Sequence, residues 1–348
     1  MAASGHQETK PVSSAVRKIA AAGMQCVRRF ALVATVCLTG ITVLTIFARE
    51  FWLADLFANL RVQWVIGLAV AAVCSMLTRR WKLLAVQLAA AAIHAPWLAP
   101  AFQTPAIQAT TPATTESFIR VTTANAYVGN RRYEDIEKEL VRFNPDVIAV
   151  VELSVGLRDH LAGRFSEHYP HSITEAMESS AFGIGLYSRI PFDEARIEYT
   201  SDRRLPGVVA QVTINQQRVR IVAAHTFPPM FPGAFRHRNK HLQMLAARVR
   251  KFRTDEPNVP VLVMGDLNLT PWSPVFSEFI ADADLVPSSR GRRPSPTWYR
   301  LPAFPFGLVL DHILTTDDLT CTELTVGSDA GSDHRFVTAE FALAATAD

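Results

Sequence analysis

Long apolar stretches occupy the first hundred residues of the chain, and only short ones follow. Residues 30–48, 62–78 and 83–99 contain no Asp, Glu, Lys or Arg. A helix that crosses a bilayer needs ~20 apolar residues, with ~17 as the lower bound. A soluble helix of this length normally carries polar residues along one face, and these stretches do not. The pattern predicts three transmembrane helices within residues 30–99.

The basic residues of this region give an expected orientation. They cluster before the first stretch and between the second and third, as Arg17, Lys18, Arg28, Arg29, Arg79, Arg80 and Lys82. Because cytoplasmic loops are enriched in Lys and Arg, we expect residues 1–29 to form a basic cytoplasmic tail and the chain after residue 100 to lie outside the cytoplasm. A cleaved signal peptide is an alternative interpretation of residues 30–48. The two further apolar stretches favour a multi-pass anchor in the cell membrane.

The pattern changes after residues 100–117, a segment rich in Pro and Thr that predicts a linker. Short apolar runs predict strands at residues 118–123, 146–151, 182–187, 208–214, 219–224, 259–264, 308–314 and 336–341. Amphipathic stretches predict helices at residues 132–143 and 235–252. Because strands and helices do not alternate regularly, we expect residues 118–348 to form an α/β sandwich of two mixed sheets.

Charge and cysteine content narrow the class of protein. The first hundred residues carry ten Lys or Arg and three Asp or Glu, whereas the remainder carries 25 and 29. This acidic balance argues against a dedicated nucleic-acid binder, which needs a basic face. Cys321 is the single cysteine after residue 100, so the predicted outer domain has no internal disulfide and depends on its hydrophobic core.

Polar residues able to do chemistry follow the ends of the predicted strands. They are Asn125, Glu152, His225, Asp266 with Asn268, Asp311, and Asp333 with His334. In α/β folds, strand ends meet at one edge, where side chains converge on a cleft. We therefore expect these residues to share one site.

Structural interpretations of the same residues stay open. Asp266 and Asn268 either face one ligand from an extended segment or form an Asx turn at a strand end. Asp311 interrupts an apolar run, where a carboxylate is costly unless it is paired. It either orients His334 as a general base or takes part in ordinary structural hydrogen bonding.

Considered together, these residues predict a more specific kind of site than any one of them does alone. Glu152 alone fits an exposed strand end, and His225 alone fits a buried core histidine. Together, the Asn, Asp and Glu oxygens suit Mg²⁺ or Mn²⁺. Zinc is disfavoured because the chain has no cysteine cluster and no HExxH motif. Two histidines beside a hard cation suit hydrolysis at phosphorus.

The ordered set of motifs resembles the endonuclease/exonuclease/phosphatase superfamily, which includes deoxyribonuclease I, sphingomyelinases and inositol-phosphate phosphatases. The matching motifs lie within residues 118–343 and are Asn125, Glu152, His225, Gly265-Asp266-Leu267-Asn268, Asp311-His312-Ile313-Leu314 and Ser332-Asp333-His334. Residues 183–191 and 295–298 also match. The resemblance implies a four-layer α/β sandwich with the site at one edge of two sheets.

The resemblance also implies roles for these residues. Asn125 and Glu152 would bind the metal, Mg²⁺ or alternatively Mn²⁺, with Asp333 near the same metal. The catalytic set would be His225, Asp266, Asn268, Asp311 and His334: Asp266 would orient or activate water, Asn268 would contact the transition state, His334 would pair with Asp311, and His225 would contact phosphate. The superfamily often has Gln before the metal-binding Glu, where this chain has Val151.

These expectations define a membrane-anchored, metal-dependent phosphoester hydrolase acting outside the cytoplasm. Resemblance to membrane-bound bacterial phosphatase-like members, some linked to glycopeptide resistance, implies a lipid-linked phosphate or pyrophosphate, or a phospholipid headgroup, as the substrate. One alternative is a nuclease acting on DNA or RNA, and another is a catalytically inactive, membrane-tethered binding module. No protein partner is indicated. The basic group Arg236, Arg238, Lys240 and His241 either meets phosphate or forms a solvated helix face.

Overall fold

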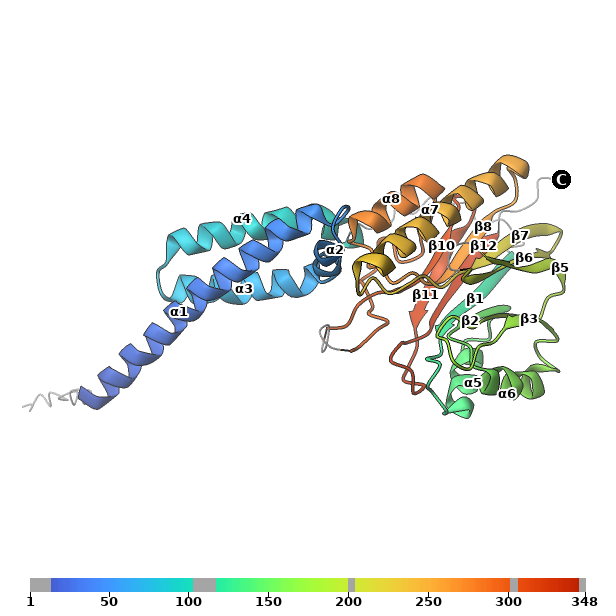
Figure 1. Cartoon of the computed structure of the whole chain (residues 1–348), viewed down its shortest axis with the longest axis horizontal. Helices are drawn as coiled ribbons and strands as arrows, with labels where there is room; N and C mark the ends of the chain where they lie inside the picture. Colours follow the sequence, from blue (N-terminus) through green and yellow to red (C-terminus); the bar gives the residue numbers. More distant parts are fainter. Residues whose placement is uncertain (1–13, 103–116, 200–203, 301–305, 344–348) are drawn as a thin grey trace, which may run out of the picture. The chain divides into compact units, whose positions relative to one another are not determined.

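The computed structural model describes residues 14–102, 117–199, 204–300 and 306–343, and the chain divides into two compact units (Figure 1). The helical unit contains Met1–Leu44 and Val62–Ala95. The α/β unit contains Thr45–Arg61 and Pro96–Asp348. The first thirteen residues of the predicted tail and most of the predicted linker, residues 103–116, lie outside the described residues.

The helical unit is apolar outside and holds polar side chains inside. It is built from α1 (Ser14–Leu44), α3 (Arg61–Leu77) and α4 (Trp81–Leu98). Val36 and Val73 are more than half exposed on its surface. The buried Gln87 donates from Nε2 to Thr35 Oγ1 at 2.6 Å and to Ser75 Oγ at 3.0 Å. Hydrogen bonds of this kind join helices inside a bilayer, where lipid surrounds the apolar outer face.

One helix among the described residues, Val16–Phe47, is long and apolar enough to cross a membrane, in agreement with the first predicted span. The helix pair Trp52–Asn59 and Arg61–Leu77 meets the same criteria only as a pair, with a bend of 68° between its members. The helix α4, which covers the third predicted span and contains Pro96, is not among these candidates. The second and third spans therefore stay predictions.

Two six-stranded sheets form the centre of the α/β unit, with the strand orders β11-β12-β1-β2-β4-β3 and β5-β6-β7-β8-β10-β9. The strands of the first sheet are β1 (Ser117–Asn125), β2 (Val147–Val151), β3 (His171–Glu175), β4 (Ile184–Ser188), β11 (Thr320–Val326) and β12 (Val337–Leu343). Those of the second are β5 (Phe192–Tyr199), β6 (Pro206–Ile214), β7 (Gln217–Ala223), β8 (Val261–Asp266), β9 (Val286–Pro287) and β10 (Asp311–Thr315).

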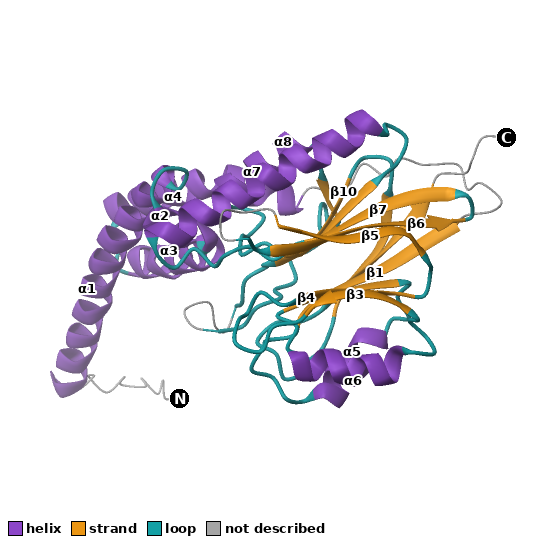
Figure 2. Cartoon of the chain, turned by 45° about the vertical axis from the view of Figure 1, so that its right-hand side comes forward, coloured by secondary structure: helices purple, strands orange, loops and turns teal. Residues whose placement is uncertain are grey.

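Helices cover the outer face of each sheet, so the unit has four layers (Figure 2). The first sheet packs against α5 (Tyr133–Val141) and α6 (Val155–Phe165), and the second against α7 (Pro232–Asp255) and α8 (Pro274–Ala283). The remaining elements of the unit are η1 (Thr45–Phe47), α2 (Trp52–Asn59) and η2 (Ala99–Phe102). The predicted sandwich of two mixed sheets flanked by helices is confirmed.

Alternation along the central strands produces these layers. In β8, Leu262 and Met264 enter the core between the sheets, whereas Val261 and Val263 enter the core beneath α7 and α8. Successive side chains of a strand point to opposite faces, so a strand covered on both sides must be apolar throughout. This explains why the most continuous apolar runs of the sequence form the centres of the two sheets.

Strand pairing brings the polar strand ends together. Strands β1 and β2 are parallel, with Asn125 opposite Val151, so Glu152 follows directly beside Asn125. In the other sheet, β10 runs antiparallel to β8, with Asp311 opposite Asp266. One edge of the sandwich therefore receives polar side chains from both sheets.

Gly265, immediately before Asp266, generates a prediction. Its φ is +144°, and a Cβ at this position would lie 1.9 Å from the carbonyl oxygen of Ala224. We expect Gly265→Ala to lower the free energy of unfolding by ~3 kcal/mol or more, because both the conformation and the space exclude a side chain. Thermal unfolding of the full-length protein in detergent measures the effect.

A matched glycine provides the control. Gly163 lies in α6, and a Cβ there would meet nothing within 4 Å. Gly163→Ala should leave stability unchanged or raise it by ~0.5–1 kcal/mol. Equal unfolding temperatures for the two variants would contradict the proposed constraint at Gly265.

Candidate active site

Asn125 is the residue that joins the two halves of the candidate site. It ends β1 and is buried. Its Nδ2 donates hydrogen bonds to Glu152 Oε1 and to Asp266 Oδ2, both at 3.0 Å, and lies 3.4 Å from His334 Nε2. Its Oδ1 accepts from the backbone N–H of Tyr127 at 3.0 Å. The amide therefore holds together carboxylates that come from different sheets.

Glu152 is aimed at this amide by an unusual backbone conformation. It follows β2 and has a φ of +55°, in the left-handed region that non-glycine residues rarely adopt. Its second oxygen, Oε2, accepts from the backbone N–H of Val128 at 3.0 Å. Strained residues of this kind persist where surrounding contacts fix them, and they are common at functional sites.

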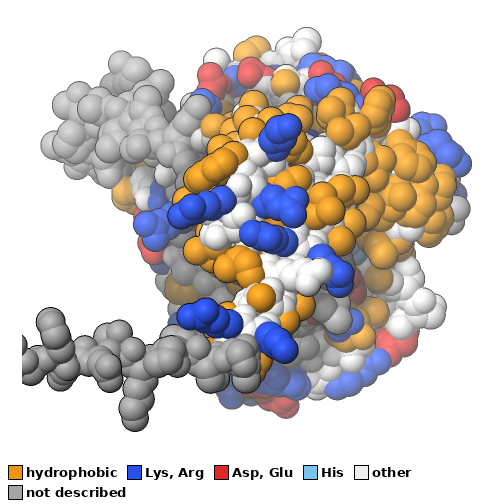
Figure 3. Space-filling model, turned by 90° about the vertical axis from the view of Figure 1, so that its left-hand side faces the viewer, with side chains coloured by type: hydrophobic (Ala, Val, Ile, Leu, Met, Phe, Trp, Pro, Cys, Tyr) orange, Lys and Arg blue, Asp and Glu red, His pale blue; other side chains and the backbone are white. Residues whose placement is uncertain are grey.

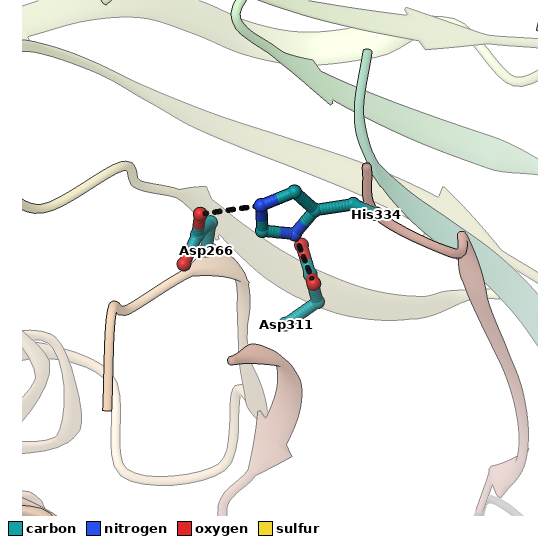
Figure 4. A group of neighbouring side chains, drawn as sticks. All are labelled: Asp266, Asp311 and His334. Carbon is teal, nitrogen blue, oxygen red and sulfur yellow. Dashed lines mark hydrogen bonds and ion pairs between the residues drawn. The ribbon is translucent and has the colours of Figure 1, made fainter. Parts of the chain in front are cut away.

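Asp311 and His334 form a buried ion pair (Figure 4). His334 Nδ1 donates to Asp311 Oδ2 at 2.7 Å. Burial opposes protonation of the ring, but the carboxylates of Asp311 and Asp266 outweigh it and raise the pKa of His334 to about 10. Burial would likewise raise the pKa of Asp311, but His334 outweighs it and holds that pKa below its usual value. The pair is therefore charged at neutral pH.

Asp266 is the carboxylate with the opposite shift. Burial raises its pKa to about 6, although the positive charge on His334 opposes this. Its Oδ2 lies 3.7 Å from Nε2 of both His334 and His225, and its Oδ1 accepts from the backbone N–H of Asn268 at 2.8 Å. A carboxylate whose pKa lies near neutrality is suited to exchange protons during a reaction.

Of the two alternatives for Asp266 and Asn268, an extended segment or an Asx turn, the structure has the Asx turn. Strand β8 ends at Asp266, the φ of Asn268 is +50°, and its backbone N–H closes an Asx turn on Asp266. The alternative of an extended segment through Asn268 is therefore wrong. Its side chain is half-buried, and Nδ2 donates to the carbonyl of Thr226 at 2.9 Å. Its contact with a transition state stays a prediction.

His225 lies on the other side of Asp266, next to an aromatic group. It is buried, and its ring centroid lies 5.2 Å from that of Phe182, which in turn lies 4.6 Å from that of Phe227. Its Nδ1 is one of the buried polar atoms without a hydrogen-bond partner among the described residues. The structure thus places His225 in the group, and its contact with phosphate stays a prediction.

Asp333 has hydrogen-bond partners outside the Asn125 cluster. Its Oδ2 accepts from Trp298 Nε1 and pairs with Arg300 Nε, both at 3.0 Å. The guanidinium of Arg300 also stacks over the ring of Tyr127, 5.0 Å from its centroid. A role for Asp333 as a metal ligand stays a prediction and would require the carboxylate to exchange these partners.

The donor atoms at the site fit a divalent cation. Glu152 and Asp266 converge on the Asn125 side chain from two sheets, and hard oxygen donors of this kind suit Mg²⁺ or Mn²⁺. A second possible ligand group, Asp266, Asp311 and His334, has its donor atoms within 4.8 Å of one another. Because His334 Nδ1 already donates to Asp311 in this second group, we favour the cluster around Glu152 and Asn125 for the metal.

Two hydroxyl side chains that support the candidate site have only weak signals in the sequence. Thr297 Oγ1 accepts from the backbone N–H groups of Leu310 and Asp311, at 3.0 and 3.1 Å. Ser332 Oγ donates to the carbonyl of Asn125 at 2.8 Å. Thr297 and Ser332 lie within predicted motifs, but short hydroxyl side chains are too common in loops to signal such a role.

Helix α2 fixes the loop that follows Asp266. In the β8–α8 loop (residues 267–273), Thr270 donates from both its backbone N–H and its Oγ1 to Asn59 Oδ1, at 2.8 and 2.9 Å. Trp272 Nε1 donates to the carbonyl of Asn59 at 2.8 Å. All these groups are buried, so a helix that precedes α3 in the chain is part of the support for the candidate active site.

A fully buried ion pair completes this contact. Arg238 in α7 donates from Nη1 to Asp55 Oδ2 in α2 at 2.9 Å, and the same nitrogen lies 3.4 Å from the carbonyl of Asn268. Neither side chain is exposed. The expected basic group at residues 236–241 is therefore divided: Arg236 and Lys240 are exposed, whereas Arg238 and His241 are buried.

Comparison with known proteins identifies the family. The chain belongs to the endonuclease/exonuclease/phosphatase family, whose sequence profile matches residues 122–334. Members of this family are metal-dependent phosphoester hydrolases, and the chain is accordingly an enzyme of this class. No curated protein sequence matches the chain.

Solved structures show the same fold. The 3′ phosphatase NExo from Neisseria, bound to a product DNA hairpin, is 20% identical with a TM-score of 0.54; the match covers 64% of this chain and 99% of that one. TDP2 from D. rerio, complexed with a single-strand DNA product, is 17% identical with a TM-score of 0.52, covering 65% and 99%. Sphingomyelinase C from Streptomyces griseocarneus is 14% identical with a TM-score of 0.50, covering 66% and 100%.

The Asp55–Arg238 pair yields a stability prediction. Asp55→Leu leaves a buried guanidinium without its carboxylate, which should lower the free energy of unfolding by ~3–5 kcal/mol. The double variant Asp55→Leu with Arg238→Met removes both charges and should regain most of that loss. Chemical unfolding of full-length protein in detergent distinguishes them. A double variant as unstable as the single one would show that the charge pair is not the stabilising contact.

The pKa of Asp266 yields a pH prediction for metal-free protein in EDTA. Its folded pKa is raised to about 6 from an ordinary 3.8. Between these values the folded state keeps a proton that the unfolded state has lost, so this group's contribution to stability is lost as pH rises. Stability of Asp266→Asn relative to wild type should therefore rise from pH 4 to pH 7, by on the order of 3 kcal/mol.

A surface aspartate is the control for this measurement. The side chain of Asp317 is 78% exposed, and Asp317→Asn should differ from wild type by nearly the same amount at every pH. If the stability difference between Asp266→Asn and wild type were equally constant from pH 4 to pH 7, the raised pKa of Asp266 in the folded protein would be refuted.

Proposed function

We propose that this enzyme is a multi-pass membrane protein whose α/β unit lies outside the cytoplasm and hydrolyses a lipid-linked phosphate or pyrophosphate, or a phospholipid headgroup. The observation that carries the proposal is the docking of α2 on the β8–α8 loop. Through Asn59 and Thr270, the loop that leaves Asp266 is attached to a helix that lies in the chain between two apolar helices. The reacting centre is thereby tied to the membrane-proximal part of the chain.

Residues around α2 have the composition of a membrane interface. Phe47 and Phe51 are about half exposed, and so is Arg49, whose guanidinium lies 5.9 Å from the centroid of the Trp97 ring. Aromatic and basic side chains gather where a bilayer meets water. An enzyme for a soluble substrate has no need of such a segment beside its catalytic loop, whereas an enzyme for a lipid phosphate does.

The basic side chains of the helical unit support the orientation. The described Lys and Arg residues at positions 17, 18, 28, 29, 79, 80 and 82 are all exposed. Figure 3 shows Lys and Arg side chains among apolar ones on the face that it presents. Because cytoplasmic segments retain positive charge, this supports a cytoplasmic location for these ends of the helices.

Glu152 and Asn125 would hold the divalent metal, Mg²⁺ or alternatively Mn²⁺, for which the Asn125 amide would turn its oxygen toward the ion. When bound, such an ion neutralises phosphate oxygens and lowers the pKa of water. Asp266, largely ionised above pH 6, accepts the proton of the attacking water. His334, kept charged by Asp311, stabilises the negative charge that develops on the phosphoryl oxygens. His225 contributes a second imidazole to the same oxygens.

The test is phosphate release from a polyprenyl pyrophosphate by full-length protein in detergent with Mg²⁺. We expect Asp266→Ala and His334→Ala each to lower kcat by ~10²–10⁴-fold, because each removes proton transfer or charge stabilisation. EDTA should abolish the activity, and added Mg²⁺ should restore it. Plasmid DNA is offered in parallel, to compare the two substrate classes.

Exposed residues of the same types serve as controls. Asp317→Ala and His168→Ala should retain wild-type rates, because both side chains are exposed and lie in no part of the described site. Activity that resists EDTA or survives Asp266→Ala would contradict the proposed chemistry. Mutation-sensitive DNA cleavage without lipid turnover would instead assign the enzyme to nucleic acid.

A further inference from the structure

A cavity of about 440 Å³ lies in the α/β unit next to the catalytic ion pair. Asp311, which binds His334, and Thr297, which supports Asp311, both form part of its lining. Its volume falls in the ~300–1,000 Å³ range of small-molecule sites. The cavity is not used by any step of the chemistry described above.

The lining of the cavity is mainly apolar. It includes Phe276 and Ile280 of α8, Leu285 just after that helix, and Leu324 of β11. Water forms few hydrogen bonds with such a lining, whereas a hydrocarbon chain is stabilised when it leaves water and contacts these side chains. The composition therefore favours an aliphatic occupant.

Three arginines also line the cavity. Arg290 and Arg293 line the cavity, are exposed, and make no ion pair within the part of the chain that the structure describes. Between them, Arg292 donates from Nη2 to the carbonyls of Cys321 and Thr322, at 3.0 and 3.1 Å. This contact fixes the segment that carries all three, so two unneutralised guanidiniums stand beside an apolar cavity. A ligand with a hydrocarbon part and an anionic part matches both features.

The end of α4 also contributes to the cavity. Pro96 and Trp97, in the last turn of α4, lie at the end of the apolar stretch predicted as the third membrane span, and Pro100 follows it; all three line the cavity. Under the proposed topology, these residues lie at the outer surface of the bilayer. One part of the cavity lining would therefore lie near the lipid headgroups, and another part is formed by Asp311.

The size of the cavity suits a hydrocarbon chain. At about 440 Å³ it has room for the first part of a single prenyl chain.

From these features we infer that the cavity binds the first part of the hydrocarbon chain of a prenyl phosphate or pyrophosphate whose phosphate reacts at the Asp266–His334 centre. This inference deepens the proposed function and rests on it. It makes α8 and the residue 287–297 segment determinants of substrate chain length. Asp266, His334 and Glu152 act on any phosphate that reaches them.

The experiment compares a five-carbon with a fifteen-carbon prenyl pyrophosphate, using full-length protein in detergent with Mg²⁺. Wild type should have a KM at least ~10-fold lower for the longer chain, because only that chain fills the cavity. Ile280→Trp and Ser277→Trp each add bulk to the lining from α8. Each should raise the KM for the longer chain at least ~10-fold and change kcat/KM for the shorter chain less than ~2-fold.

Ala281→Trp is the matched control, because Ala281 is on the same helix but exposed to solvent. It should leave both substrates unaffected. The use of two filling variants, one replacing an apolar residue and one replacing a serine, separates cavity filling from loss of folding. Equal losses for both substrates in both variants would overturn the inference, because a general structural defect would explain them.

A binding readout separates failure of this inference from failure of the proposed function. A fifteen-carbon alkyl phosphate with a photoreactive group at the chain end should crosslink within residues 274–293 of wild type and lose that crosslink in Ile280→Trp. Hydrolysis with crosslinks elsewhere would overturn the chain site and leave the proposed function standing. Crosslinks in the cavity without hydrolysis of either pyrophosphate would overturn the proposed function and support the chain site. Neither hydrolysis nor crosslinking would overturn both.

Discussion

The buried ion pair between Asp311 and His334 is the interaction on which the rest of the site depends. Taking an imidazolium and a carboxylate out of water is costly, and hydrogen bonds to the groups around the pair offset part of that cost. Thr297 positions the backbone of Asp311, and Ser332 donates to Asn125 while accepting from the backbone of His334. The hydrogen bonds around the pair therefore explain why residues from both sheets must meet at this edge.

The same constraint extends to α2. A buried Arg238 needs a carboxylate, and the partner comes from a helix 183 positions earlier in the chain rather than from the sandwich itself. Its contact with the carbonyl of Asn268 brings this second ion pair close to the turn that shapes Asp266. The stability of the edge that carries the candidate site and its attachment to α2 therefore depend on the same contacts. A catalytic domain cut at residue 118 would lack them.

Strands that are buried along much of their length could be predicted from the sequence. Contacts between residues far apart in the chain could not. Strands β2, β6, β7 and β8 contain runs of buried apolar residues and lie close to their predicted bounds. Strands β3, β5 and β11, at the sheet margins, contain exposed polar residues and were not predicted. Strand-end positions revealed the candidate site because a polar residue after a buried strand is a local signal. The Asp55–Arg238 pair has no local signal, since each residue looks like part of a solvated helix face.

Asp266 and Asp311 lie on neighbouring strands, and their different surroundings shift their pKa values in opposite directions. Asp266 and Asp311 face each other across β8 and β10, and both are buried. Asp311 has the imidazolium of His334 within hydrogen-bond distance, so its charge is favoured; Asp266 lies 3.7 Å from the same ring, so desolvation prevails. Pairs of groups whose pKa values are pushed apart can act as stabiliser and proton acceptor at one pH. Because the strand register fixes both positions, the opposite pKa shifts of the two carboxyl groups follow from the pairing of β8 with β10.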